Sequence, residues 1–219
     1  MVYLSFDVGI KNLAYCVLSE EKEIQQWGII NLNKNPICCS NLRKPCCKQS
    51  SYIVKGKGDC EDKYYCTAHS KKIKQKKKLN ANYDLFELSK TLFTELEALD
   101  LSNVKYVLIE NQPALKNPTM KSIQMFVYSF FMMKGVMEES SFIEKIHMVN
   151  ARNKLKVYKG KPLPCPYKEK YKQNKYLSVK YTELMINNEK DNFIQLFKES
   201  SKKDDLADAY LQGIYWIEK

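Results

Sequence analysis

Short apolar segments separated by polar turns open the chain. Val2 to Val8 and Leu13 to Leu18 are two such segments, joined by Gly9-Ile10-Lys11-Asn12, and Glu23 to Leu32 follows with a partly alternating pattern. Short apolar runs broken in this way are typical of strands in a meander. The pattern therefore predicts a three-stranded antiparallel start.

A helical pattern begins near residue 82. Leucines recur at three- and four-residue spacing, at positions 85, 88, 92 and 96, after Asn82, which is a residue type that caps helices. An apolar run from Val104 to Ile109 follows, and Pro113 cannot continue a central strand. We expect a helix over about 82–100 and then a strand that leads into Glu110.

The C-terminal half alternates between helix and strand. A helix over about Thr119 to Met137 is apolar on most sides, which is typical of a helix buried in a core or against a partner. Lys145 to Asn150 is a candidate strand, and the loop Gly160 to Pro166 interrupts a mostly helical remainder that ends with a helix over Asp204 to Glu218. Strands first, then alternating strands and helices, predict an α/β fold around a sheet of mixed direction.

The composition changes abruptly between Asn33 and Lys78. This segment holds six of the eight cysteines, glycines at positions 56 and 58, and six lysines among residues 71–78. We therefore predict an inserted module at 33–81 with a basic tail, and a main domain formed by residues 1–32 and 82–219. A chain of 219 residues is long enough for one domain with such an insertion.

The charge balance indicates a polyanionic partner. Thirty-six Lys and Arg against 25 Asp and Glu give a net charge of +11, and nucleic acid is the leading partner for such an excess. The N-terminus shows no secretory or lipid signal, and the most apolar stretch, Ile123 to Met137, is too short and too polar to span a membrane. We expect a soluble, intracellular protein without a membrane partner.

The clustered cysteines predict a zinc site. In an intracellular chain cysteines are more often metal ligands or plain buried residues than disulfides. Cys66-Thr67-Ala68-His69 can place a thiolate and an imidazole on one tetrahedral zinc ion, and the doublets Cys38-Cys39 and Cys46-Cys47 offer the other two ligands.

The ligand set of that zinc site stays partly open. We predict Cys39, Cys46, Cys66 and His69, but the doublets do not decide between Cys38 and Cys39 or between Cys46 and Cys47, and Cys60 is spare. The alternative is a set of reduced, unliganded thiols. An insertion with so few large apolar residues needs an additional cross-link, such as a bound metal ion, in order to fold, and this need favours zinc.

Acidic residues stand at the ends of apolar runs in three distant parts of the chain. Asp7 and Glu110 follow predicted strands, and Asp208 shares a helical face with Asp205 or with Asp204. Such acids also have plain structural uses, because Asp caps turns and acidic residues complement a helix N-terminus. Two acids on one packed face repel each other unless a cation or a proton compensates, and Mg²⁺ prefers carboxylate oxygens.

Three ordered motifs carry a resemblance to a known family. They are similar to the motifs of RuvC-type Holliday junction resolvases, most of all the poxvirus and large-DNA-virus branch: Phe6-Asp7-Val8-Gly9-Ile10-Lys11-Asn12, Ile109-Glu110-Asn111-Gln112-Pro113 and Lys203-Asp204-Asp205-Leu206-Ala207-Asp208-Ala209. The resemblance covers residues 1–32 and 82–219. It implies a ribonuclease H-like mixed sheet flanked by helices, a homodimer that cuts four-way DNA junctions, and action at viral replication sites in the host cell.

The resemblance also assigns roles to the acids. It implies that Asp7, Glu110, Asp205 and Asp208 are catalytic and hold two Mg²⁺ per active site, with Asp204 as a supporting candidate. We therefore predict a Mg²⁺-dependent, structure-specific endonuclease that resolves Holliday junctions and other branched DNA by phosphodiester hydrolysis.

Other functions fit parts of the pattern. A nuclease of the same fold could act on flaps or RNA-DNA hybrids, and a non-catalytic zinc-containing protein could simply bind nucleic acid. A sugar-kinase-like ATPase would need a second glycine-rich phosphate loop, and the sequence has none.

Two basic stretches are candidates for DNA contact. The lysine run at 71–78 is either a solvated charge run or a phosphate-binding surface. In the stretch 167–176 three lysines, Lys168, Lys172 and Lys175, are expected to share one helical face, while its tyrosines either stack on unpaired bases or sugars or pack inward. The residues we predict to contact DNA are Lys11, Lys72, Lys76, Lys168, Lys172 and Lys175.

Overall fold

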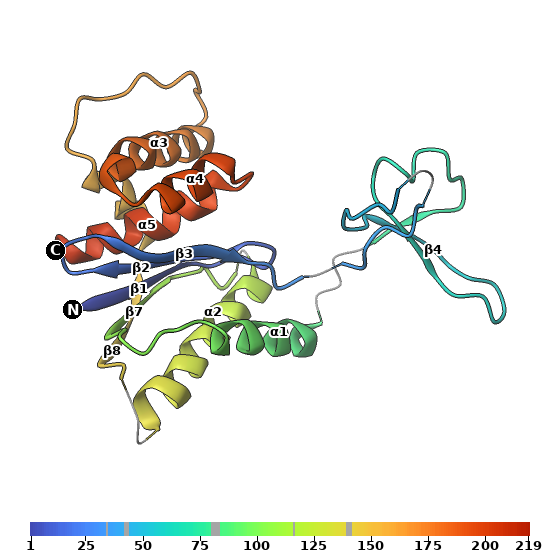
Figure 1. Cartoon of the computed structure of the whole chain (residues 1–219), viewed down its shortest axis with the longest axis horizontal. Helices are drawn as coiled ribbons and strands as arrows, with labels where there is room; N and C mark the ends of the chain where they lie inside the picture. The colour runs from blue at the N-terminus through green and yellow to red at the C-terminus, as the bar shows by residue number, and fades with distance from the viewer. Residues whose placement is uncertain (34, 42–43, 80–83, 116, 139–141) are drawn as a thin grey trace. The chain divides into compact units, whose positions relative to one another are not determined.

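The computed structural model describes residues 1–33, 35–41, 44–79, 84–115, 117–138 and 142–219. The chain divides into two compact units (Figure 1). Met1–Leu32 and Leu85–Lys219 form the larger unit, and Asn33–Asp84 forms the inserted unit. The predicted helix cap at Asn82 lies outside the described residues.

A mixed five-stranded sheet forms the centre of the larger unit. Strands β1 (Val2–Asp7), β2 (Leu13–Ser19) and β3 (Ile24–Ile30) pair antiparallel, which confirms the predicted meander. Strands β7 (Tyr106–Glu110) and β8 (Lys145–Val149) extend the sheet in parallel, in the order β3-β2-β1-β7-β8. The sheet is therefore of mixed direction, as predicted.

The register of this sheet places two acids side by side. Strands β1 and β7 are parallel neighbours in which Phe6 pairs with Ile109, so the next residues, Asp7 and Glu110, end both strands at the same edge. The carboxyl edge of such strands is where open α/β sheets bind ligands.

Helices cover both faces of the sheet (Figure 1). One face carries α1 (Leu85–Glu97) and α2 (Pro118–Phe131), and the other carries α3 (Lys170–Met185), α4 (Asp191–Glu199) and α5 (Lys203–Ile217). None of the helices in the described ranges is long and apolar enough to cross a membrane.

Some helical segments depart from the α-helical pattern. Helix α2 continues as a π-helix at Met132–Met137, and 3₁₀ segments occupy Ala151–Val157 and Ile186–Asn188. One side of α2 is buried in the core, whereas Met125 on the other side is 42% exposed and is where the sequence-based alternative of a partner contact would apply.

Helix α5 packs very close to the sheet because it carries a glycine at the contact. A Cβ at Gly213 would lie 2.5 Å from Cδ1 of Leu18, a distance that side chains do not tolerate. The buried side chain of Gln212 is satisfied by donating to Ser5 Oγ at 3.0 Å and to the Phe6 carbonyl at 3.1 Å. These contacts fix the depth of α5 against β1, and thus the position of the acids on its first turns.

The inserted unit has a small sheet and almost no apolar core. Strands β4 (Tyr52–Val54), β5 (Lys63–Tyr65) and β6 (Lys77–Lys78) pair antiparallel in the order β5-β4-β6. Among its described residues only two cysteines and two serines are buried: Cys38, Ser50, Cys66 and Ser70. The burial in this unit is therefore centred on sulfur ligands rather than on aliphatic side chains.

Candidate functional site

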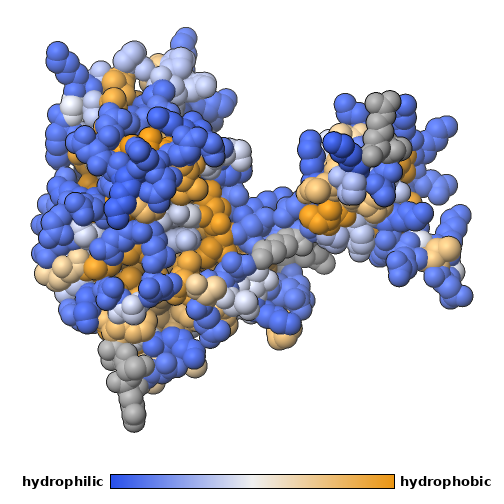
Figure 2. Space-filling view, in the orientation of Figure 1, coloured by the Kyte–Doolittle hydropathy of each residue, from blue (hydrophilic) through white to orange (hydrophobic). Residues whose placement is uncertain are grey.

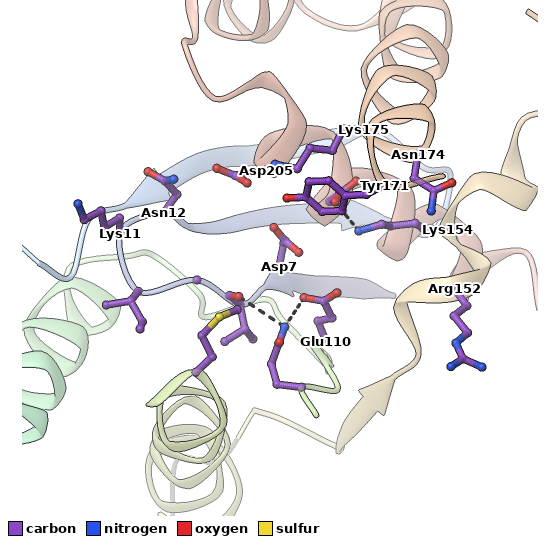
Figure 3. A pocket seen from close by; sticks show the side chains of 16 residues that line it. Asp7, Lys11, Asn12, Glu110, Arg152, Lys154, Tyr171, Asn174, Lys175 and Asp205 are labelled. Atoms are coloured by element: carbon purple, nitrogen blue, oxygen red, sulfur yellow. Dashed lines mark hydrogen bonds and ion pairs between the residues drawn. The ribbon is translucent and has the colours of Figure 1, made fainter. Parts of the chain in front are cut away.

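A cavity of about 450 Å³ opens where β1 and β7 end (Figure 3). All four acids that the sequence singles out line it: Asp7, Glu110, Asp205 and Asp208. We call this space the acidic cavity. Its wall combines the two strand ends with the 3₁₀ segment Ala151–Val157 and with helices α3 and α5.

Asp7 stands at the centre of this charge cluster. Its carboxylate and that of Glu110 face the same space from neighbouring strands (Figure 3). Burial raises the pKa of Asp7 well above its ordinary value, and the charges of Glu110 and Asp208 raise it further. The charge of Lys154 opposes this shift without cancelling it. Asp7 is therefore costly to ionise until a further cation is present.

The two oxygens of Asp208 have different surroundings. One oxygen, Oδ2, forms an ion pair with Lys154. The other, Oδ1, is buried and has no hydrogen-bond partner among the described residues. Burial raises the pKa of Asp208 above its ordinary value although Lys154 lowers it in part. An unpartnered buried carboxylate oxygen that faces other carboxylates suits a cation.

The structure separates the neighbouring acids Asp204 and Asp205. Asp204 forms an ion pair with Lys175, and this contact outweighs burial and lowers the pKa of Asp204. Asp205 lines the acidic cavity instead, and burial together with the charge of Asp204 raises its pKa. This arrangement leaves Asp205, rather than Asp204, without a basic partner among the described residues at the cavity, and the choice of Asp205 as a metal ligand stays a prediction.

Lys154 is a site residue that the sequence pattern did not reveal. Its side chain is only 15% exposed and reaches into the acidic cavity from the 3₁₀ segment (Figure 3). Burial alone would lower the pKa of Lys154, but Asp208, Asp7 and Glu110 raise it above its ordinary value. The ammonium is thus a fixed internal counter-charge, contributed by a segment whose periodicity gave no signal.

Gln112 holds Glu110 in place. Its side-chain amide donates to Glu110 Oε2 at 2.5 Å, and its backbone N–H donates to Oε1 of Gln124 at 2.8 Å. Gln124 is fully buried in α2, and its Oε1 also accepts from Lys121 at 3.1 Å. The second motif therefore supplies both an acid and the amide that orients it, a role that the sequence analysis did not assign.

The basic residues predicted near this site divide into two groups. Lys11 and Lys175 line the acidic cavity, although Lys175 is already paired with Asp204. Lys172 pairs with Glu169 at 2.8 Å. The predicted shared helical face is wrong for Lys168, because α3 begins at Lys170 and Lys168 precedes it.

The tyrosines of the same stretch also differ in their environments. Tyr171 is 63% exposed, lines the acidic cavity, and has Lys175 Nζ 5.2 Å from its ring centroid. Tyr167 packs edge-on against Tyr176, with 5.7 Å between the ring centroids. Only Tyr171 is placed to meet a ligand in the cavity.

The donor set of the acidic cavity fits divalent cations. All four acids offer carboxylate oxygens, which are the ligands that hard cations such as Mg²⁺ prefer. Burial and mutual repulsion raise the pKa values of Asp7, Asp205 and Asp208 although basic side chains also line the cavity, and Asp208 Oδ1 lacks a partner among the described residues. A divalent cation would relieve the cost of ionising these acids.

A second group of metal-ligating side chains lies in the inserted unit. We call Cys38, Cys46, Cys66 and His69 the cysteine cluster, because one ligand atom of each lies within 4.8 Å of all the others. His69 Nδ1 is 3.5 Å from the sulfurs of Cys38 and Cys66, and the sulfurs of Cys46 and Cys66 are 4.0 Å apart. In a zinc tetrahedron, sulfur lies about 3.8 Å from sulfur and about 3.5 Å from nitrogen.

The surroundings of Cys66 favour its thiolate form, whereas those of Cys46 do not. Backbone N–H groups of His69 and Ala68 lower the pKa of Cys66, together with the neighbouring thiols. The backbone N–H of Lys48 acts in the same direction on Cys46, but burial and the adjacent thiols leave the pKa of Cys46 raised. Zinc binds the thiolate, so a donor already aimed at sulfur prepares the site.

The structure corrects the choice of Cys39 as a zinc ligand. Backbone N–H groups of Cys38 and Cys39 donate to opposite neighbours, Lys48 and Tyr64, as in an extended segment. Successive side chains then point to opposite faces. Cys38 is buried in the cluster, whereas Cys39 is exposed.

The two lysines predicted to bind DNA in this unit also differ. Lys72 is exposed. Lys76 is half-buried, donates to the Ser70 carbonyl, and lies 5.2 Å from the ring centroid of Tyr52. Lys76 thus stabilises its own unit, which argues against a main role in DNA contact.

Comparison with known proteins identifies relatives of this chain. Residues 3–113 match the family described as mitochondrial resolvase Ydc2 / RNA splicing MRS1. A protein of Acanthamoeba polyphaga mimivirus, itself described only as uncharacterised, is 30% identical over 319 residues, covering 100% of this chain and 75% of that protein.

Solved structures share the fold. The fowlpox virus Holliday junction resolvase has a TM-score of 0.54 at 16% identity, covering 100% of this chain and 99% of its own. The yeast mitochondrial Holliday junction resolvase Ydc2 has a TM-score of 0.53 at 18% identity, covering 98% and 78%. Thermus thermophilus RuvC, solved with a Holliday junction substrate, has a TM-score of 0.50 at 12% identity, covering 98% and 91%. The fold is thus the RuvC-type, ribonuclease H-like fold that the motifs predict.

Proposed function

Because the chain belongs to the family of the mitochondrial resolvase Ydc2 and the RNA splicing protein MRS1, we propose that it is an endonuclease that resolves four-way DNA junctions. Holliday junction resolvases are endonucleases, but a family that also includes a splicing protein requires the site itself to support catalysis. The observation that carries the proposal is the convergence of Asp7, Glu110, Asp205 and Asp208 on one cavity. The viral relative supports action at sites of viral DNA replication.

We propose that these four acids hold two Mg²⁺ ions. Such ions polarise the scissile phosphodiester, activate water and stabilise the leaving oxygen. The raised pKa values of Asp7, Asp205 and Asp208 support this occupancy, as does the unpartnered Oδ1 of Asp208 within the described residues.

The side chains around the acids have their own tasks in this proposal. Gln112 keeps Glu110 oriented, and Lys154 pairs with Asp208 and partly offsets the burial that raises the pKa of that carboxyl. Lys11 and Arg152 line the cavity and offer cationic donors to the phosphates on either side of the scissile bond. Cleavage would leave a 5′ phosphate and a 3′ hydroxyl, as the resemblance implies.

We also propose that the active form is a homodimer. A four-way junction is resolved by paired incisions, and each chain provides one acidic cavity, so two chains related by a two-fold axis supply both cuts. Helix α2 and its π-helical continuation present exposed methionines that suit such contact: Met125, Met133 and Met137.

In the inserted unit, we propose that Cys38, Cys46, Cys66 and His69 bind a structural Zn²⁺. Three distances between their ligand atoms, 3.5, 3.5 and 4.0 Å, are close to those of a zinc tetrahedron, all four atoms lie within 4.8 Å of one another, and four protein ligands would close the coordination sphere. The near absence of large buried side chains in the described part of this unit supports a folding role for the metal.

A substrate panel tests the proposed activity against its alternatives. Wild-type protein with Mg²⁺ is incubated with a four-way junction, a flap, an RNA-DNA hybrid and a linear duplex of equal length. We expect paired cuts in the junction at rates that exceed those of the other substrates. Preferred cleavage of the flap or the hybrid identifies the alternative nuclease, and binding without any cleavage identifies a non-catalytic protein.

A further inference from the structure

The positive charge of this chain is concentrated in one unit. The inserted unit, Asn33–Asp84, carries 13 Lys and Arg against four Asp and Glu, which is a net charge of +9 out of +11 for the chain. The larger unit carries 23 basic against 21 acidic residues, or +2. The unit with the acidic cavity is therefore nearly neutral, while a quarter of the chain holds almost all of the excess.

The charges of the inserted unit face solvent. The exposed lysines include Lys44, Lys48, Lys57, Lys63, Lys71, Lys72, Lys74, Lys77 and Lys78. Its acids are too few to neutralise them, and one of the four, Asp62, already pairs with Lys55 at 2.6 Å. Figure 2 shows hydrophilic side chains over most of the visible surface of the unit that bears the β4 label in Figure 1.

The densest part of this surface is held in a fixed conformation. At its start, the backbone N–H of Ser70 donates to the Cys66 carbonyl at 2.9 Å, within the turn that carries two members of the cysteine cluster. At its end, β6 pairs with β4, and the N–H of Leu79 donates to the Ser51 carbonyl at 2.9 Å. The lysine run is therefore an ordered surface anchored at both ends, and not a basic tail.

Lys76 keeps the middle of the run folded onto the unit. Its ammonium donates to the Ser70 carbonyl and lies over the Tyr52 ring, while its neighbours in the run stay exposed. The remaining lysines are thus presented on one ordered scaffold, which lowers the entropy lost when they contact a ligand.

We propose that the inserted unit is the main DNA-backbone-binding surface of the chain, with Lys71, Lys72, Lys74 and Lys77 contacting phosphates. This inference rests on the proposed nuclease function and adds the source of its DNA affinity. The acidic cavity is lined by four acidic and four basic side chains, and the larger unit as a whole carries only +2, so this unit offers little net attraction for the DNA backbone. Ammonium groups that neutralise phosphates release counterions and bind without regard to sequence.

Matched charge variants of the zinc-loaded full-length chain test the proposal. One variant carries Lys71→Gln, Lys72→Gln, Lys74→Gln and Lys77→Gln. The control removes four exposed lysines of the larger unit: Lys90→Gln, Lys145→Gln, Lys190→Gln and Lys198→Gln. Fluorescence anisotropy measures the affinity for a labelled four-way junction and for a linear duplex, without Mg²⁺, across a range of KCl concentrations.

We expect the inserted-unit variant to lose at least about tenfold in affinity for both DNAs at moderate salt, and its slope of log K against log salt to fall by about 0.9 for each lysine that contacts a phosphate. The control variant should show a change in the logarithm of DNA affinity that is less than half the change in the inserted-unit variant. Equal losses in both variants, or wild-type binding by the inserted-unit variant, overturn the proposal. Unchanged DNA binding with lost binding to phosphatidylserine vesicles also overturns it and identifies a membrane surface.

Cleavage under single-turnover conditions separates this inference from the proposed function. With protein in excess at low salt, the inserted-unit variant should cut the junction at a rate within about twofold of wild type, because its acidic cavity is unchanged. If wild type does not cut any DNA but the binding results hold, the proposed nuclease function fails and the binding surface stands.

Discussion

At the scale of single residues, the acidic cavity contains carboxylates whose ionisation lowers the stability of the folded chain. Burial and neighbouring carboxylates raise the pKa values of Asp7, Asp205 and Asp208, whereas Lys175 lowers that of Asp204. Sites of this kind lower the stability of the metal-free protein in exchange for function.

Asp7→Asn should therefore stabilise the metal-free chain. A carboxyl group whose pKa is raised in the folded state lowers the free energy of unfolding as the pH rises from its unfolded-state pKa through its folded-state pKa. This loss of stability is therefore present at neutral pH. We expect the unfolding midpoint at pH 7.5 to rise by a few degrees, since about 1 kcal/mol corresponds to about 2–4 °C for a chain of this size. Thermal unfolding without Mg²⁺ measures it.

Asp204→Asn is the matched control for this stability prediction. Lys175 lowers the pKa of Asp204, so its charge contributes stability that is present above the unfolded-state pKa and lost as the pH falls through the folded-state pKa. This variant should have a lower unfolding midpoint than wild type. A fall for Asp7→Asn as well would contradict the assigned repulsion.

Gln112 should act through Glu110. Gln112→Ala removes the amide that donates to Glu110 Oε2, and residues that orient a metal ligand typically contribute about 10–100-fold to metal affinity or activity. We expect slower junction cleavage and a higher Mg²⁺ concentration for half-maximal rate. Asn111→Ala, whose side chain accepts from Lys121 at 3.2 Å, is the control. A lower rate with an unchanged Mg²⁺ dependence would refute the orienting role.

At the scale of elements, sequence patterns located the parts of the site that strand ends and one helix deliver. Asp7 and Glu110 were predictable because each follows an apolar strand, and Asp205 with Asp208 because three-residue spacing places them on one helical face. Lys154 was not predictable, because its 3₁₀ segment has no periodic apolar pattern and its approach depends on tertiary packing.

The inserted unit shows the same limit of sequence patterns. The Cys-x-x-His spacing indicated the metal site, but the choice between Cys38 and Cys39 depends on which side of an extended segment faces the cluster. That face is set by pairing with distant residues, which no local pattern contains.

Zinc content should follow the cysteine cluster. We expect about one Zn²⁺ per wild-type chain, loss of the metal in Cys38→Ser and Cys66→Ser, and full retention in Cys39→Ser. Elemental analysis of the purified proteins measures it, with limited proteolysis between residues 33 and 84 as a second readout. Zinc loss from Cys39→Ser with retention in Cys38→Ser would reverse the ligand assignment.

Zinc binding should also weaken on acidification. Ligating cysteines and histidine must be deprotonated, so the affinity falls as the pH drops below the thiol and imidazole pKa values. The backbone N–H groups that donate to Cys66 lower the pKa of its thiol. Zinc should therefore stay bound at a lower pH than it would without these donors.

At the scale of the whole molecule, the chain combines a nearly neutral unit that carries the acidic cavity with a basic unit that carries the cysteine cluster. In the roles proposed above, this division separates DNA affinity from catalysis. Substitutions of lysines in the inserted unit should therefore lower DNA affinity and leave the cleavage rate largely intact. Substitutions of the acids in the larger unit should lower the cleavage rate and leave DNA affinity largely intact.

A second prediction at this scale concerns the proposed dimer and the coupling of its two cuts. Met133→Lys with Met137→Lys places charge on side chains that are 64% and 73% exposed, and we expect the dimer to dissociate because buried unpaired charge is costly. Sedimentation measures the mass, and cleavage of a plasmid-borne junction shows whether the two cuts remain coupled. Leu184→Lys, on α3 and 45% exposed, is the control. A wild-type monomer that makes both cuts would contradict the dimer.

The central claim is that the acidic cavity cuts junction DNA. The most direct measurement is single-turnover cleavage of a four-way junction with Mg²⁺ by wild type, Asp208→Asn and Asp204→Asn, with binding measured in parallel. We expect Asp208→Asn to bind the junction but to cut it at least about 100-fold more slowly, since even residues that only orient a metal ligand contribute up to that factor. Asp204→Asn should stay within about tenfold of wild type. Wild-type cutting by Asp208→Asn, or binding without cutting by the wild-type protein, would rule out the proposed nuclease site.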